Sequence, residues 1–226
     1  MLYIYYERII NMKDKKTGLL FDLDGTLWDS SEAVVRSWNE VIRTLPDFHK
    51  EVTLEDMTHL MGKTMDEIAY EFFDTVSKPR ALELMQMCTD NENVYIEKHG
   101  GNLMPDLEET LKILSKEYFL AIVSNCQQGY IEAFLSYHKL GKYFDDRLDF
   151  ATTNLPKGDN IAIVVKRNSL DRAFYIGDIQ GDKDASDHAG IPFIHASYGY
   201  GAVPDAPYRI PSLSALPSLL KNILQT

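Results

Sequence analysis

The pattern of apolar positions divides the chain into an N-terminal strand, a helical stretch and a long alternating region. Short apolar runs, which are typical of buried strands, occur near the N-terminus and again after residue 101. In the alternating region these runs are separated by segments whose apolar residues recur every three or four positions, as in an amphipathic helix. The predicted strands are 17–23, 119–125, 147–152, 172–178 and 192–197, and the predicted helices between them are 105–117, 127–140, 157–168 and 180–190.

Residues 30–99 carry helical patterns and no strand pattern. The first helix is predicted to begin after Asp29, which we expect to cap it, with Glu32 three residues later completing a capping box. Two shorter helices are predicted to begin at Thr53 and Thr64, because each threonine also has an acidic residue three positions later. Together with one longer helix, the predicted segments are 30–45, 53–62, 64–76 and 79–98.

The alternation of strands and helices predicts an α/β fold with a doubly wound, Rossmann-like parallel sheet, and the helical stretch predicts an inserted α-helical cap domain. We expect the core to comprise residues 13–29 and 102–226 and the cap to comprise residues 30–101. Residues 1–12 are expected to be an N-terminal extension. Methionine and phenylalanine side chains are expected to form the hydrophobic core of the cap, namely Met57, Met61, Phe72, Phe73, Met85 and Met87.

The composition narrows the possible functions. The 226 residues carry a formal net charge of −11, which disfavours binding to nucleic acid or to an anionic membrane surface. The chain has two cysteines, Cys88 and Cys126, without CxxC spacing, so that neither a disulfide framework nor a zinc site is expected. No apolar run approaches the roughly 18 residues of a membrane span. We therefore expect a cytoplasmic monomer or homodimer.

Polar side chains follow the predicted strands where each strand ends. Asp22 and Asp24 come after the first strand, and Ser124 and Asn125 close the second. In an open parallel sheet the carboxyl ends of the strands share one edge, where ligands bind. Side chains at these ends are therefore expected to converge, and the remaining members of the set are Gly177, Asp178, Asp182 and Lys157.

These residue types fit phosphoryl transfer. Three carboxylates in one crevice, those of Asp22, Asp24 and Asp178, repel one another unless a cation lies among them or the pKa of one rises. Mg²⁺ suits a site with few carboxylates, several waters and a phosphate oxygen. One carboxylate can attack phosphorus while a neighbouring carboxyl group protonates the leaving oxygen and then activates water. Ser124 and Lys157 suit the oxygens of the transferred group.

Four motifs resemble, in order, those of phosphatases of the haloacid dehalogenase superfamily. They are "DLDGT" (22–26), "SN" (124–125), Lys157 and "GDxxxD" (177–182). The resemblance is closest to the phosphoglycolate phosphatase-like branch, which has a helical cap between its first two motifs. Two positions depart from the family pattern: Gly158 follows the lysine where proline is common, and Ile179 stands where threonine is frequent.

The resemblance implies a role for each motif residue. Asp22 would be the nucleophile and Asp24 the general acid and base. Asp22, the main-chain carbonyl of Asp24, and Asp178 would hold Mg²⁺, while Asp182 would support this metal site from outside its ligands. The phosphoryl group would be bound by Gly25, Thr26, Ser124, Asn125 and Lys157, and the substrate would be selected by the cap residues Gly62, Lys63 and Thr64.

The function predicted in this way is a Mg²⁺-dependent phosphatase that hydrolyses a small phosphorylated metabolite through an aspartyl-phosphate. A phosphosugar mutase and a pyrophosphatase are alternatives on the same fold, although Met61 stands where mutases usually have a basic residue before the cap glycine. A second class is a non-catalytic protein that binds a phosphorylated ligand. Such a protein would be expected to lack one of Asp22, Asp24 and Asp178, and all three are present.

Overall fold

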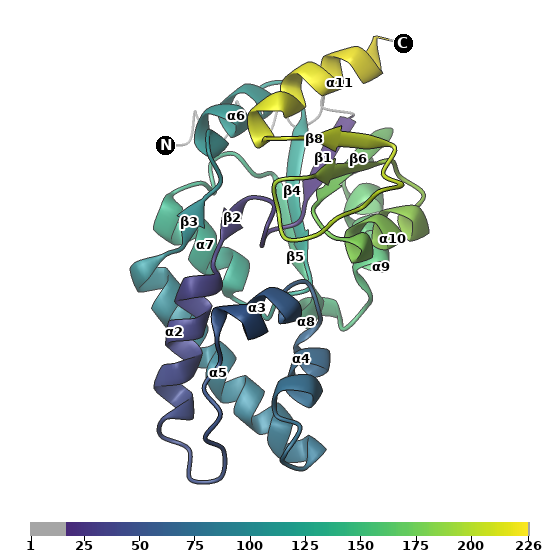
Figure 1. Cartoon of the computed structure of the whole chain (residues 1–226). Helices are drawn as coiled ribbons and strands as arrows, with labels where there is room; N and C mark the ends of the chain where they lie inside the picture. Colours follow the sequence, from purple (N-terminus) through teal and green to yellow (C-terminus); the bar gives the residue numbers. More distant parts are fainter. Residues whose placement is uncertain (1–16, 226) are drawn as a thin grey trace.

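The computed structural model describes residues 17–225, and its centre is a six-stranded sheet whose strands all run parallel (Figure 1). The strands lie in the order β5-β4-β1-β6-β7-β8, so that β4 and β6 flank β1 on opposite sides. Such a reversal of strand order leaves a crevice at the carboxyl ends of the strands. The strands are β1 (Thr17–Phe21), β4 (Phe119–Ser124), β5 (Asp146–Asp149), β6 (Arg172–Gly177), β7 (Phe193–Ala196) and β8 (Tyr208–Ile210).

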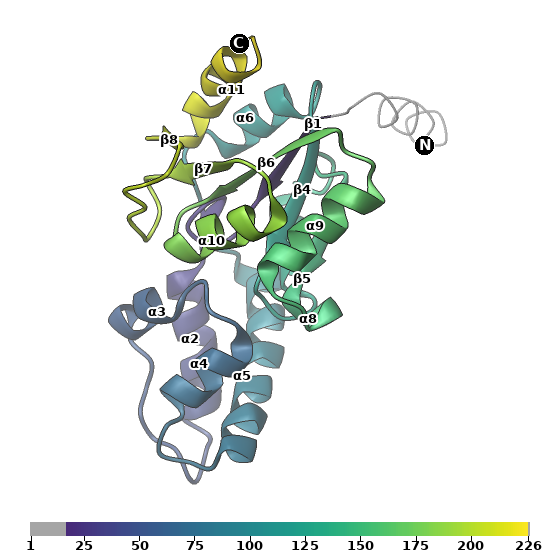
Figure 2. The same ribbon diagram turned by 90° about the vertical axis from the view of Figure 1, so that its right-hand side faces the viewer.

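Helices cover both faces of this sheet (Figure 2). Successive side chains of a strand point to opposite faces, and in β1 the Leu20 side chain joins one apolar layer while Leu19 and Phe21 join the other. Helices α9 (Lys157–Arg167) and α10 (Gln180–Ala189) pack on the Leu20 face. The predicted α/β fold with a doubly wound parallel sheet is confirmed. The opposite face is covered by α6 (Leu107–Leu114), α7 (Tyr130–His138), the short 3₁₀ turn η1 (Leu213–Ala215) and α11 (Leu216–Leu224).

The helical cap lies below the sheet in Figure 1, on the side of the carboxyl ends of the strands. The chain enters the cap through β2 (Trp28–Asp29) and leaves it through β3 (Asn102–Leu103), and these two short strands pair antiparallel. The two connections between core and cap therefore lie side by side. The boundaries at residues 30 and 101 stay a prediction, and the expected extension 1–12 lies outside the described residues. The cap helices are α2 (Ser31–Ile42), α3 (Leu54–Leu60), α4 (Met65–Phe72) and α5 (Lys78–His99).

The predicted helix starts were correct at two positions and wrong at one. Thr53 and Thr64 form capping boxes with Asp56 and Glu67, as their spacing predicts. At α2 the N-cap is Ser30 and not Asp29. The Asp29 carboxylate instead accepts hydrogen bonds from the amide (3.0 Å) and hydroxyl (2.5 Å) of Ser31, and Glu32 pairs with Arg36. The Asp29 carboxylate is occupied by Ser31, so that the predicted capping box with Glu32 does not form.

Local hydrogen bonding also shortened one predicted strand. The segment 147–152 was expected to be extended, but β5 ends at Asp149, whose carboxylate accepts a hydrogen bond from the amide of Thr152 (2.7 Å). This bond caps a short helix, α8 (Phe150–Thr153). The sheet also has an edge strand, β8, that the hydrophobic pattern did not predict, because only three residues pair there.

The hydrophobic core of the cap departs from the prediction at one residue. Met57, Phe72, Phe73 and Met85 are buried, whereas Met87 lies on the outer face of α5 and is 42% exposed. Met61 is half-buried and contributes to the cavity described below. Among residues 17–225, none of the helices combines the length and the apolar character that crossing a lipid bilayer requires.

Candidate active site

Three neighbouring strands deliver polar side chains to the crevice at the carboxyl edge of the sheet. Asp22 directly follows β1, Ser124 ends β4, and Asp178 directly follows β6. The parallel register brings these ends level, since the amide of Asp22 donates a hydrogen bond to the carbonyl of Ile176 (2.8 Å). The polar residues are buried because strands on both sides and the cap below enclose this edge.

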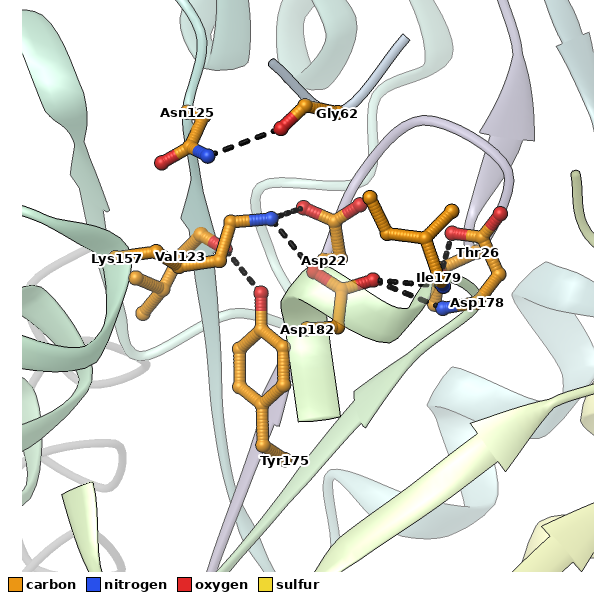
Figure 3. A network of polar contacts seen from close by, with 10 residues as sticks. All are labelled: Asp22, Thr26, Gly62, Val123, Asn125, Lys157, Tyr175, Asp178, Ile179 and Asp182. Atoms are coloured by element: carbon orange, nitrogen blue, oxygen red, sulfur yellow. Dashed lines mark hydrogen bonds and ion pairs between the residues drawn. The ribbon is translucent and has the colours of Figure 1, made fainter. Parts of the chain in front are cut away.

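Lys157 joins two of the acids. Its ammonium group donates hydrogen bonds to Oδ1 of Asp22 (2.9 Å) and Oδ1 of Asp182 (2.7 Å) (Figure 3). The other oxygen of Asp182 accepts from the amides of Asp178 (3.0 Å) and Ile179 (3.2 Å) at the start of α10. Asp182 is thus occupied by three donors and fixes both the lysine and the backbone of Asp178. Because Lys157 is buried, water does not screen its ammonium group, and its charge acts strongly on the Asp22 carboxylate.

Negative charge exceeds positive charge at this point. Carboxylate oxygens of Asp22, Asp178 and Asp182 lie within 4.8 Å of one another, and Lys157 is the cation that contacts them. Burial raises the pKa of Asp22 well above its usual value, although Lys157 opposes this shift. Burial and the Asp182 charge raise the pKa of Asp178 to about 7. A bound cation would offset the cost of burying these carboxylates together, and their hard oxygen donors fit a divalent cation such as Mg²⁺.

The backbone directly after Asp24 permits close approach to Asp178. Gly25 has a φ of +81°, and a Cβ atom there would lie 2.4 Å from Oδ2 of Asp178. Only glycine fits this position. The Asp178 carboxylate also accepts hydrogen bonds from the Thr26 hydroxyl (3.2 Å) and from the amide of Tyr200 (2.7 Å). The hydroxyl of Thr26, predicted to bind phosphate, is therefore directed at Asp178.

Asp24 has a different environment from Asp22. Its Oδ1 accepts a hydrogen bond from the hydroxyl of Ser30 (2.6 Å), and the hydroxyl of Tyr130 lies 2.9 Å from the same oxygen. The Tyr130 and Ser30 hydroxyls are themselves 2.8 Å apart. Burial raises the pKa of Asp24, which favours its protonated form. The two aspartates of the first motif thus differ in partner: Asp22 faces a cation and Asp24 faces neutral hydroxyl groups.

The cap reaches the core at the turn between α3 and α4. The side-chain amide of Asn125 donates a hydrogen bond to the carbonyl of Gly62 (3.0 Å) (Figure 3). Gly62 has a φ of +84°, and a Cβ atom there would lie 2.3 Å from Cδ1 of Ile179. The turn therefore rests directly on the core. Asn125, predicted to bind phosphate, holds the cap instead in this arrangement.

The three cap residues predicted to select the substrate do not share one position. Gly62 and Lys63 line a cavity together with Asp22 and Asp24. The Lys63 ammonium group is bound by the carboxylate of Glu71 (2.7 and 2.9 Å). Thr64 begins α4, where its hydroxyl donates to Glu67 (2.9 Å), and it is absent from the described lining of the cavity.

Four polar or aromatic residues of the cavity lining were missed by the sequence reasoning: Trp38, Glu92, Gln127 and Tyr130. A signal existed for one of them. Glu92 lies four residues from both Cys88 and Ile96, so that it continues the buried stripe of α5. An acidic residue in that stripe indicates a buried carboxyl group. Trp38 lies on α2 of the cap, Gln127 in the loop after β4 and Tyr130 at the start of α7, and no local pattern specifies that these segments meet.

Most of the chain, including the four motifs, matches known proteins. Residues 19–196 match a protein family described as haloacid dehalogenase-like hydrolase. The pyrophosphatase PpaX of Listeria welshimeri is 29% identical over 188 residues, which are 79% of this chain and 82% of that protein. A phosphoglycolate phosphatase of Pseudomonas syringae pathovar tomato is 25% identical over 197 residues, which are 80% of this chain and 70% of that protein.

The fold of the chain is also similar to that of a known structure. The crystal structure of a haloacid dehalogenase-like hydrolase from Bacteroides fragilis aligns with a TM-score of 0.78 at 24% identity, over 89% of this chain and 100% of that one. The segment that matches the family contains all four motifs quoted above, from Asp22 to Asp182. The resemblance seen in these motifs is thereby confirmed, and the chain belongs to the haloacid dehalogenase-like hydrolase family.

Proposed function

We propose that the protein is a Mg²⁺-dependent phosphatase that hydrolyses a small phosphomonoester through an aspartyl-phosphate intermediate. The observation that carries the proposal is the contrast between two neighbouring carboxyl groups: Asp22 forms an ion pair with the Lys157 ammonium group, whereas Asp24 accepts hydrogen bonds from the hydroxyl groups of Ser30 and Tyr130. A nucleophile needs its charge and a general acid needs its proton. The phosphatase names of the relatives support the same class of reaction.

The charge balance of the site supports the metal requirement. Asp22, Asp178 and the main-chain carbonyl of Asp24 would hold Mg²⁺, while Asp182 would keep Lys157 and Asp178 in place. When bound, the ion would neutralise the carboxylates and draw electron density from the phosphoryl group.

In the first half-reaction, a carboxylate oxygen of Asp22 forms a bond to phosphorus, and the bond from phosphorus to the ester oxygen breaks. Asp24 gives its proton to that leaving oxygen, so that the alcohol departs neutral. Lys157 and Ser124 supply positive charge and a hydroxyl donor for the phosphoryl oxygens. Gly25 and the Thr26 backbone would lie against the same group.

In the second half-reaction, ionised Asp24 takes a proton from a water molecule, which attacks the phosphorus of the aspartyl-phosphate. The bond between phosphorus and Asp22 breaks, inorganic phosphate leaves, and both carboxyl groups return to their starting states. The cap turn at Gly62 covers the site, which would keep bulk water out until the alcohol has left.

The first prediction tests this assignment. Hydrolysis of p-nitrophenyl phosphate and of small alkyl phosphates is measured with Mg²⁺ and with excess chelator, on the wild type and on Asp22→Asn. We expect activity to require Mg²⁺ and to fall on the order of 10³-fold or more in the variant, because the nucleophile is lost. Asp184→Asn, an exposed acid on α10, is the matched control and should retain activity. Turnover that survives Asp22→Asn would refute the nucleophile assignment.

A further inference from the structure

The cavity beside Asp22 and Asp24 is enclosed between the core and the cap, and its wall on the cap side is mostly apolar. Because Asp24 lines this cavity and would protonate the leaving oxygen, the leaving alcohol of the substrate must lie here. The apolar part of the wall comes from three cap helices and the turn between α3 and α4, and it consists of Val34, Trp38, Met57, Met61, Met65 and Ile68.

One buried carboxyl group interrupts this apolar wall. Glu92 of α5 is 4% exposed and lines the cavity. Its Oε1 accepts a hydrogen bond from the side-chain amide of Gln127 (2.9 Å), and its Oε2 accepts one from the indole of Trp38. A carboxylate has about four acceptor positions, so that two protein donors leave capacity for a ligand.

Glu92 is not neutralised by the protein. Within residues 17–225, no lysine, arginine or histidine forms an ion pair with it, and the charged group that acts on it is another acid, Asp24. Burial raises the pKa of Glu92 to about 7. Its two N–H donors, Gln127 and Trp38, are neutral, so that the negative charge of an ionised Glu92 would be balanced only by a cationic partner. The open side of Glu92 is the cavity.

Among the described residues, the cavity lining offers no free basic side chain that could bind an anion. Among the described lining residues, Lys63 is the only one that is basic, and Glu71 already holds its ammonium group with both oxygens. Asp22, Asp24 and Glu92 line the same cavity. A leaving group with a carboxylate or a second phosphate would meet Glu92 without a free cation to balance it.

Resting on the proposed phosphatase activity, we infer that the substrate is the phosphate ester of an amino alcohol, with its ammonium group against Glu92 and its carbon chain against the apolar wall. The Trp38 ring lines the same cavity as Glu92 and adds to its apolar wall. Esters with an anionic leaving group, such as phosphoglycolate and pyrophosphate, are disfavoured by the same arrangement.

The test compares matched substrates on the wild-type protein with Mg²⁺. Aminoalkyl phosphates of increasing chain length are paired with the alkyl phosphates of equal length, and phosphoglycolate, pyrophosphate and p-nitrophenyl phosphate are run beside them. For one chain length we expect kcat/KM to be at least about tenfold higher for the aminoalkyl ester than for its alkyl partner. Phosphoglycolate and pyrophosphate are expected to be poorer than that alkyl partner.

A variant shows whether Glu92 causes the preference. In Glu92→Gln the ratio of kcat/KM between the aminoalkyl and alkyl partners should fall towards one, mainly through KM of the aminoalkyl ester. Glu97→Gln, an exposed acid on the same helix, is the matched control and should keep the wild-type ratio. The wild-type comparison decides the proposal by itself if Glu92→Gln does not fold.

The outcomes separate this inference from the proposed function. Hydrolysis of p-nitrophenyl phosphate together with equal or better turnover of phosphoglycolate or pyrophosphate overturns the amino-alcohol assignment and leaves the phosphatase standing. An ammonium preference that persists in Glu92→Gln overturns the role of Glu92. If no ester, p-nitrophenyl phosphate included, is hydrolysed, the proposed function fails and the inference fails with it.

Discussion

At the scale of single residues, the behaviour of Asp24 depends on two hydroxyl groups. Ser30 and Tyr130 both lie within hydrogen-bond distance of Oδ1 of Asp24. Burial raises the pKa of this carboxyl group, whereas the two hydroxyl donors lower it, because they stabilise the ionised form. Tyr130 comes from α7, far along the chain, and its hydroxyl donates a hydrogen bond to Oδ1 of Asp24. We therefore expect Tyr130 to be a positioning residue.

Substitution of Tyr130 tests this expectation. Tyr130→Phe removes a donor to the ionised form of Asp24, so that the pKa of Asp24 should rise further. The first half-reaction needs protonated Asp24 and loses rate as pH rises through that pKa. The basic limb of kcat/KM against pH for an alkyl phosphate should therefore move to higher pH. The maximal rate should fall about tenfold, a part of the usual acid–base contribution.

A tyrosine on the same helix provides the control. Tyr137 is 42% exposed, and Tyr137→Phe should leave both the maximal rate and the pH profile as in the wild type. A basic limb that stays at the wild-type pH in Tyr130→Phe would show that its hydroxyl does not act on Asp24.

At the scale of elements, the turn between α3 and α4 is one place where the cap meets the core, and another is the packing of α5 on α7. Gly62 contacts Ile179 at the start of α10, and its carbonyl is bound by Asn125 at the end of β4. Ile179 stands where threonine is frequent in the family motif. Its apolar side chain packs against the turn at Gly62. The turn thus packs closely on Ile179, and a side chain at residue 62 would require Ile179 or the turn to move.

Gly62→Ala should therefore disturb closure. Its Cβ would approach Cδ1 of Ile179 to 2.3 Å, and alanine is strained at a φ of +84°. We expect a loss of stability of about 1 kcal/mol from the backbone strain. Displacement of the turn should also lower kcat/KM by about tenfold, since site closure is impaired. Steady-state kinetics and urea unfolding measure the two effects.

A substitution at Gly190 is the control that separates the effect of backbone strain from the effect of cap closure. It has a φ of +71° at the end of α10, and a Cβ there would meet nothing within 4 Å. Gly190→Ala should lose a similar amount of stability while kcat/KM stays at the wild-type value. Equal kinetics for Gly62→Ala and Gly190→Ala would contradict the role of the turn in closure.

At the scale of the whole molecule, the proposed metal site joins two separate segments of the chain. Asp22 lies directly after β1, and Asp178 and Asp182 lie in the segment that runs from the end of β6 into α10. Mutual repulsion of these buried acids destabilises the folded state without a cation. A divalent ion that binds the folded state alone stabilises it by mass action.

Thermal unfolding with and without Mg²⁺ measures this linkage. Millimolar Mg²⁺ should raise Tm by about 2–4 °C, the shift expected for about 1 kcal/mol in a chain of this size. In Asp178→Asn the increase should disappear, because a ligand and a negative charge are both lost. Asp184→Asn keeps the buried acids and should respond like the wild type. A response to Mg²⁺ that persists in Asp178→Asn would argue against Asp178 as a ligand.

The order of residues along the chain was sufficient to predict the fold class and to place the motif residues at one edge of the sheet. Runs such as Leu19-Leu20-Phe21 are too apolar to lie outside a sheet, and in parallel sheets the residue after such a run must emerge at the carboxyl edge. Asp22, Ser124 and Asp178 could therefore be placed at one edge from the pattern alone. Helix starts were predictable where one side chain decides them, as at Thr53, and failed at Asp29 because Ser31 competed locally.

The residues that surround the carboxyl edge of the sheet could be identified only from the three-dimensional structure. The positions of Tyr130 beside Asp24, of Gly62 against Ile179 and of Glu92 in the cavity wall depend on how the cap packs on the core. That packing is the sum of many weak apolar contacts between segments distant in the chain, and no local period encodes it. The reactive groups follow from the order of residues along each strand, whereas the environment of the leaving group follows from the relative placement of two folded parts.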